Sequence, residues 1–149
     1  MPHFGLMNTK ESFETEEGAL LRSRIHIRAG KRKLLQGKIS DSIVTFYDAL
    51  LFALRWYIAS PERRKLLPGG EQVDRTDEKE IFNALLRAPV LQIEFDYNFF
   101  DSLVEKALDE EITDYDPSGM IRNFDTFMEQ LGVLPFDEAE LPPEKPSAF

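Results

Sequence analysis

The residue types best suited to binding a ligand are basic, and they are concentrated near the N-terminus. Between Gly18 and Ser40 the chain has no acidic residue but carries seven of its 18 Lys and Arg residues. Arginine and lysine side chains at such spacings can converge on phosphate or carboxylate oxygens. This run therefore predicts a surface that binds a partner protein or a nucleotide-like phosphate ligand. The predicted contact residues are Arg24, Arg28, Lys31 and Arg32.

The later part of the chain is acidic. The net charge is −9, and residues 94–140 contain 14 Asp and Glu residues against only Lys106 and Arg122. An acidic total argues against broad nucleic-acid binding, although a basic stripe still attracts phosphates locally. The basic and acidic parts can equally neutralise each other within the fold or across a dimer. Both interpretations of the basic run stay open at this point.

A second candidate site is a calcium loop in residues 114–125, DYDPSGMIRNFD. Its oxygen-bearing residues and its glycine follow the spacing of an EF-hand loop. Against this interpretation, Arg122 stands at a ligand position, the last position is Asp rather than Glu, and there is no second loop in the sequence. The matching residues are Asp114, Asp116, Ser118, Gly119, Ile121 and Asp125.

The same segment can instead begin a helix. Asp116 suits an N-cap, and Pro117 suits the first helical position, where the backbone N–H is not needed. A calcium loop would delay the helix to about Asn123, so the two interpretations exclude each other. The helix cap is the simpler account, and we predict no metal ligand in this chain.

A third candidate is acid–base chemistry by Arg22 and His26. The two residues are spaced i, i+4 on one helix face, where they could hold a phosphate and move a proton, as in a divergent ribonuclease. Ile25 and Ile27 flank the histidine, and this favours a structural, half-buried or surface position. The sequence has no Gly-x-Ser-x-Gly, glycine-rich phosphate loop or His-Glu-x-x-His motif. We predict no catalytic residue and no cofactor.

The composition indicates a cytoplasmic soluble protein. Cysteine is absent, which excludes disulfides and thiolate ligands and is compatible with a reducing compartment. The first 18 residues are polar and acidic, unlike a signal peptide. The most apolar stretch, residues 43–59, contains Asp48 and Arg55, and we expect it to be too short and amphipathic to span a bilayer.

Residues 37–59 must organise the fold that positions these candidates. Their large apolar residues recur at i, i+3, i+4 and i+7 for about six turns, which predicts an amphipathic helix. The apolar arc is so wide that the helix needs partners on several sides, so it should lie at the centre of a bundle. The residues of the arc are Ile39, Ile43, Phe46, Tyr47, Leu50, Leu51, Leu54, Tyr57 and Ile58.

Four more helices are expected around the central one. The first covers residues 17–36, ends at Gly37 and packs closely through small residues at Ser23 and Gly30. Residues 61–75 read as a loop, and a third helix should start at Thr76 or Asp77 and stop before Pro89. A fourth follows a cap at Asn98, and a fifth runs from Pro117 to Leu131 with Gly132 as its stop. Residues 90–95 alternate like a strand but have no evident partner.

The predicted architecture is therefore an all-α, up-down bundle of about five helices in residues 17–132. Residues 1–16 form an N-terminal arm, and residues 133–149 form an acidic, proline-rich tail that is extended or disordered. Leu134 and Phe136 of the tail are apolar enough to lie against the bundle.

Residues 19–59 resemble the HEPN superfamily of prokaryotic helical bundles. The similarity lies in a helix with small residues, a glycine-containing link and a long apolar helix, GKISDSIVTFYDALLFALRWYIA, with Gly37, Ser42, Ala49 and Ala53 at contact sites. The resemblance implies an up-down bundle of four or five helices, often a homodimer, of the kind found as toxins, nucleases or companions of nucleotidyltransferases. A nucleotidyltransferase is therefore a possible partner. HEPN nucleases carry an Arg followed four to six residues later by His in a late helix. This chain lacks that motif, because its only histidines are His3 and His26.

Overall fold

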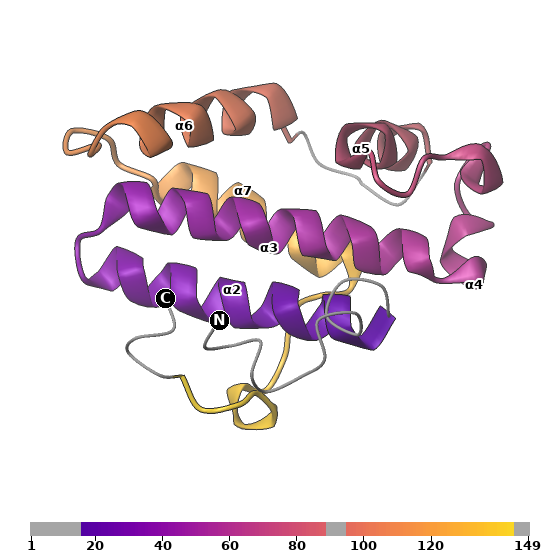
Figure 1. Ribbon diagram of the computed structural model, residues 1–149, viewed down its shortest axis with the longest axis horizontal. Helices are drawn as coiled ribbons and strands as arrows, with labels where there is room; N and C mark the ends of the chain where they lie inside the picture. Colours follow the sequence, from indigo (N-terminus) through magenta and orange to yellow (C-terminus); the bar gives the residue numbers. More distant parts are fainter. Residues whose placement is uncertain (1–15, 89–94, 145–149) are drawn as a thin grey trace.

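The computed structural model describes residues 16–88 and 95–144 of the chain. The described residues form helices and turns, with no strand (Figure 1), so the predicted all-α bundle of about five helices is confirmed. The helices are α2 (Glu16–Leu35), α3 (Ile39–Ala59), α4 (Pro61–Arg64), α5 (Glu78–Arg87), α6 (Tyr97–Asp109) and α7 (Ser118–Leu131). Two single 3-10 turns complete the list, η2 (Gly70–Gln72) and η3 (Glu138–Glu140).

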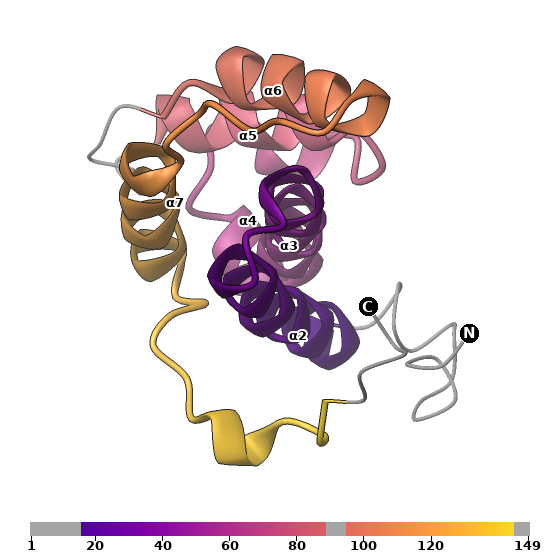
Figure 2. The ribbon, with the colours of Figure 1, turned by 90° about the vertical axis from the view of Figure 1, so that its left-hand side faces the viewer.

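Helix α3 lies at the centre of the molecule. In Figure 1, α5 and α6 lie on one side of it, α2 on the opposite side and α7 behind; Figure 2 shows the same arrangement from the end of the α2–α3 pair. Of the 21 residues in α3, 13 are buried, as expected for a helix that is apolar over a wide arc. The prediction that residues 37–59 form the central helix is confirmed, with its first residue at Ile39.

Helices α2 and α3 form a close antiparallel hairpin. Gly37 joins them with a φ of 76°, a conformation that costs glycine little. The Ser23 hydroxyl donates to the carbonyl oxygen of Ala49 at 2.8 Å. A Cβ added at Gly30 would lie 2.8 Å from Cε1 of Phe46, so the aromatic ring occupies the space that any larger residue would need. The predicted close packing through Ser23 and Gly30 is confirmed.

Aromatic rings join α5 and α7 to this hairpin. The ring of Phe46 on α3 lies 5.1 Å from that of Phe124 on α7. Phe127, also on α7, lies 4.7 Å from Phe95 and 5.7 Å from Phe82 on α5. Tilted and offset pairs at these separations add to the hydrophobic gain of burying the rings.

Aspartate caps explain where α5 and α6 begin, and one of them corrects a prediction. Asp77 accepts a hydrogen bond from the Glu80 amide at 3.1 Å, which confirms it as the start of the third predicted helix. The predicted cap at Asn98 is wrong: Asp96 accepts from the Phe99 amide at 2.9 Å, so the helix begins one residue before Asn98. An aspartate two positions earlier supplies the same oxygen with a full charge.

Three other predictions are corrected or lie outside the described residues. The loop predicted for residues 61–75 contains the short helices α4 and η2, because Ser60 caps the first of them and a proline follows it. The N-terminal arm lies outside the described residues, except that Glu16 already belongs to α2. Of the strand-like stretch, residues 90–95, all but Phe95 also lie outside them.

The C-terminal segment, which we define as residues 133–144, runs from the end of α7 across the outer side of α2 (Figure 2). Val133 and Leu141 are buried. Leu134 and Phe136 are partly buried against the core, as their apolar character suggested. Residues 145–149 lie outside the described part of the chain.

The whole of α3, residues Ile39–Ala59, is long and apolar enough to cross a membrane by length and composition alone, whereas the expectation from the sequence concerned only residues 43–59. However, 67% of the most apolar stretch of α3 is buried inside the protein. The core helix of a soluble protein has the same composition, since it too is surrounded by apolar side chains.

Replacing Gly30 with alanine tests the close contact between α2 and α3. Alanine favours a helix by about 1 kcal/mol over glycine, but its Cβ would collide with Phe46, which is fully buried. Overpacking of this kind costs about 1–3 kcal/mol. We expect a net loss of about 1 kcal/mol in the free energy of unfolding, measured by urea denaturation.

The matched control is Gly119→Ala in α7, where the nearest atom to an added Cβ is 3.9 Å away. This change should leave stability unaltered or raise it. In a chain that already carries Phe46→Leu, the smaller side chain makes room for the added methyl group. Gly30→Ala should therefore cost less stability there than in the native chain. An increase in stability for Gly30→Ala alone would contradict the close contact.

Candidate anion-binding surface on α2

The arginine row of α2, which we define as Arg24, Arg28 and Arg32, lies beneath the C-terminal segment. Arg24 Nε donates to the Val133 carbonyl oxygen at 3.0 Å, and its guanidinium carbon lies 5.5 Å from the centre of the Phe136 ring. Residues four apart share one helix face, so all three arginines can meet the same extended segment.

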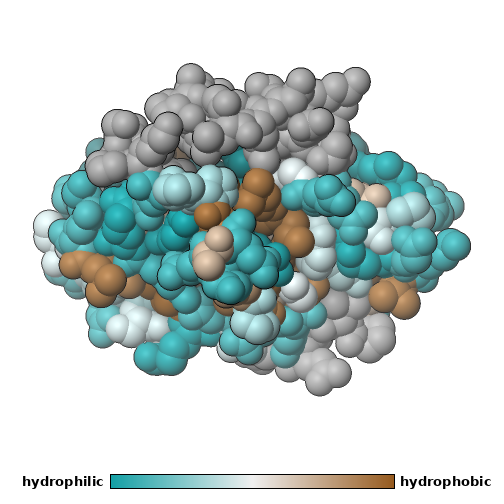
Figure 3. Space-filling model, turned by 90° about the horizontal axis from the view of Figure 1, so that it is seen from below, coloured by the Kyte–Doolittle hydropathy of each residue, from teal (hydrophilic) through white to brown (hydrophobic). Residues whose placement is uncertain are grey.

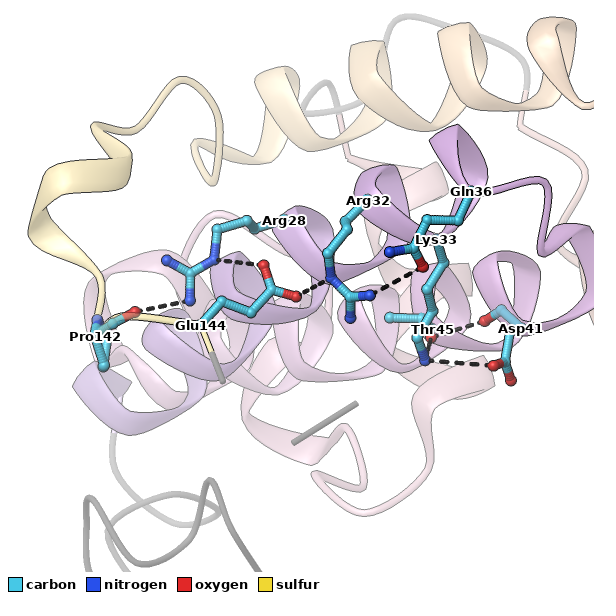
Figure 4. Close-up of polar contacts among 8 residues, drawn as sticks. All are labelled: Arg28, Arg32, Lys33, Gln36, Asp41, Thr45, Pro142 and Glu144. Carbon is cyan, nitrogen blue, oxygen red and sulfur yellow. Dashed lines mark hydrogen bonds and ion pairs between the residues drawn. The ribbon is translucent and has the colours of Figure 1, made fainter. Parts of the chain in front are cut away.

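Two of these arginines hold one carboxylate between them (Figure 4). Arg28 donates to the Pro142 carbonyl oxygen at 2.8 Å, and its Nε lies 3.6 Å from one oxygen of Glu144. Arg32 Nε contacts the other oxygen of Glu144, and a further nitrogen of Arg32 donates to Gln36 at 3.2 Å. The Arg28 and Glu144 side chains are 14% and 17% exposed, so solvent screens this contact less than an ordinary surface pair.

Lys31 does not belong to this arrangement. Its ammonium group lies 3.3 Å from Oδ2 of Asp125 on α7, and its side chain is 46% exposed. Lys31 comes seven residues after Arg24 and lies near the same helix face, but its ammonium group is directed to α7 rather than to the C-terminal segment. The structure therefore brings together three of the four predicted residues, and the fourth pairs with another helix.

A second polar row lies between α2 and α3, and sequence reasoning missed it. Lys33 is buried and donates to the Thr45 hydroxyl at 2.9 Å, with Asp41 at 4.0 Å (Figure 4). Burial lowers the pKa of Lys33, and Asp41 partly opposes this effect. Burial likewise raises the pKa of Asp48, against the attraction of Lys33 and Arg22. The sequence does carry an indication of this row, because Lys33 and Asp48 are opposite charges on the two helices of the predicted hairpin.

Arg22 and His26 are both buried, with 3% and 7% of their surface exposed, so the histidine is more enclosed than predicted. Nδ1 of His26 lies 2.8 Å from the carbonyl oxygen of Arg22. Both side chains also lie over the Phe52 ring, at 5.1 Å for the guanidinium carbon and 5.5 Å for the imidazole centre. Burial lowers the pKa of Arg22 to about 10, and Asp48 opposes this effect. These contacts are those of packed, structural side chains.

The segment predicted as either a calcium loop or a helix start begins α7 at Ser118. Asp116 accepts hydrogen bonds from the Ser118 hydroxyl at 2.5 Å and from its amide at 3.0 Å, and these bonds lower the pKa of the Asp116 carboxyl. Pro117 is the last residue before the helix rather than its first. Within residues 16–88 and 95–144 no group of three His, Asp or Glu residues could hold a metal ion.

No family model, curated protein or solved structure matches this chain. The resemblance of residues 19–59 to HEPN proteins therefore stays a prediction.

Replacing Asp48 with asparagine tests the polar row between α2 and α3. A carboxyl whose pKa is raised in the folded state stabilises the fold at low pH, and this stabilisation is lost as the pH rises through the folded pKa. The amide does not titrate. As the pH rises from about 3 to about 7, the free energy of unfolding of the native chain should therefore fall relative to that of Asp48→Asn.

The measurement is urea denaturation at a series of pH values. Asp109→Asn, at an exposed carboxyl that ends α6, is the control and should show no comparable trend. A difference that shifts against Asp48→Asn as the pH rises would show that Lys33 and Arg22 outweigh burial.

Proposed function

We propose that this protein is a non-catalytic helical-bundle binding protein that recognises an acidic, extended segment of a partner protein. The arginine row of α2 is the recognition surface. The observation that carries the proposal is the Glu144 carboxylate held between Arg28 and Arg32. In this view the chain's own C-terminal segment occupies the surface as a partner segment would.

The contacts support a peptide more than a free phosphate. Arg24 and Arg28 donate to backbone carbonyl oxygens, those of Val133 and Pro142, and every extended peptide offers such oxygens in series. Only the Glu144 contact needs a negative charge, and guanidinium pairs bind carboxylates well. A nucleotide would satisfy the charged position but would leave the carbonyl-binding positions without their acceptor.

The C-terminal segment must leave before a partner can bind. Because it is tethered to α7, it competes at a high effective concentration, which lowers the apparent affinity of any free peptide. A partner therefore needs either more contacts than residues 133–144 supply or a high local concentration of its own.

The identity of the partner is proposed from the resemblance to HEPN proteins. That resemblance favours a homodimer and an associated nucleotidyltransferase. A cytoplasmic location is proposed from the absence of cysteine. Nothing in the arginine row requires catalysis, since its three side chains donate hydrogen bonds to groups that do not react.

A labelled peptide with the sequence of residues 133–144 tests the surface in the full-length chain. Glu144→Gln weakens the competing segment, so this variant should bind the peptide more tightly than the native chain. Adding Arg28→Gln and Arg32→Gln to it should weaken binding by about tenfold or more, because charge-assisted hydrogen bonds contribute about 1.5–3 kcal/mol each. Fluorescence anisotropy measures the affinities.

The control for total charge is Lys106→Gln, an exposed cation on α6, which should not change the affinity. Equal peptide binding with and without the two arginine substitutions would refute the surface. Binding of inorganic phosphate or ATP without binding of the peptide would instead support the phosphate interpretation of the basic run.

A further inference from the structure

A cavity of about 370 Å³ lies between α2, α7 and the C-terminal segment. Figure 3 views the molecule from the side of η3, and apolar side chains gather near the centre of this face among hydrophilic ones. The volume equals that of roughly a dozen water molecules and falls at the small end of the range for ligand sites. The cavity is lined by Ile27, Arg28, Lys31, Asp125, Glu129, Leu134, Pro135, Phe136 and Glu138.

The cavity has an apolar part. Ile27 belongs to α2, while Leu134 and Phe136 belong to the C-terminal segment and are partly buried on the core. These side chains can contact a short hydrocarbon or aromatic body, because a ligand there removes apolar surface on both sides from water.

The positive charges at the cavity already have partners. Arg28 donates to the Pro142 carbonyl oxygen and lies beside Glu144. Lys31 pairs with Asp125 at 3.3 Å. A negatively charged ligand would have to compete with both sets of contacts.

The carboxylates at the cavity have fewer partners than the cations do. The carboxylates of Glu129 and Glu138 make no ion pair and no side-chain hydrogen bond with the described part of the chain. The third carboxylate, Asp125, keeps Oδ1 buried without a hydrogen-bond donor while Oδ2 faces Lys31. Because Oδ1 has almost no accessible surface, Asp125 does not offer it to a ligand, and the exposed Glu129 and Glu138 supply the open acceptors of the cavity.

We infer that this cavity binds a small organic cation, an ammonium or guanidinium group carried on a short apolar body. The charged head lies between Glu129 on α7 and Glu138 on η3, and the apolar body lies against Phe136 and Leu134. Ammonium and guanidinium groups carry several N–H donors, which suits a site that offers carboxylate oxygens from two separate elements.

The cation head and the proposed peptide surface use different charged side chains, but Leu134, Phe136 and Glu138 belong to the C-terminal segment that a partner peptide would displace. Peptide binding should therefore exclude the cation, and the glutamate variants distinguish the two sites. Loss of cation binding on mutation of these glutamates, with peptide binding retained, would separate the two sites. Loss of peptide binding on mutation of Arg28 and Arg32, with cation binding retained, would also distinguish the two sites.

Isothermal titration of the full-length chain with phenethylamine and agmatine tests the site. Both cations should bind, and phenethyl alcohol and phenylacetate, which match phenethylamine in size, should bind at least tenfold more weakly or not at all. Glu129→Gln and Glu138→Gln should each weaken cation binding about fivefold or more, because each removes a charged acceptor. In NMR spectra, phenethylamine should shift the amide signals of Phe136 and Asp125 more than those of α5.

Glu140→Gln provides the matched control, since Glu140 belongs to the same 3-10 turn but does not line the cavity. Its affinity for both cations should equal that of the native chain. The inference is overturned if neither cation binds, if the alcohol or the acid binds as tightly as the amine, or if both cavity variants retain native affinity.

Discussion

The close contact between α2 and α3 determines where every other group on α2 can lie. Gly30 faces the Phe46 ring and Ser23 donates to the Ala49 carbonyl oxygen, so one side of α2 is held against the central helix in a single register. The 3.6-residue period then places the arginine row on another side. A shift of α2 by one residue would move that row away from the C-terminal segment. Packing inside the hairpin thus controls the chemistry offered at its surface.

The contacts of the C-terminal segment serve stability and binding with the same atoms. Glu144 neutralises part of the run of seven cations, and the partial burial of Arg28 and Glu144 limits solvent screening. Any partner that replaces the segment must offer comparable oxygens, or the arginines lose their hydrogen bonds in a partly dry environment. This requirement favours ligands that resemble residues 133–144 in charge and in backbone geometry.

Short-range features of the fold were predictable, and long-range ones were not. Periodicity identifies α3, and the preferences of Gly37 and Asp77 mark helix ends, because these effects depend on residues within one turn. The cap at Asp96 was missed because Asn98, two positions later, is also a good cap. The path of the C-terminal segment depends on contacts more than a hundred residues apart in the chain, and composition alone does not encode such pairing. The separate pairing of Lys31 with Asp125 is another contact across the chain, and helical spacing does not predict it, because Lys31 and Arg24 are seven residues apart.

The cations of the basic run differ in how deeply they are packed into the hairpin, and only those at its edge can exchange one partner for another. Lys33 is buried against Thr45 on α3, and burial lowers its pKa; Arg22 is buried as well. Releasing either would expose apolar surface of the hairpin and break its packing. Arg28 and Arg32 instead hold a segment at the edge of the molecule, where the replacement of one carboxylate by another leaves the helices unchanged. A charge count over the whole run therefore overstates the binding surface, because the orientation of each cation on the helix decides which contacts can be exchanged.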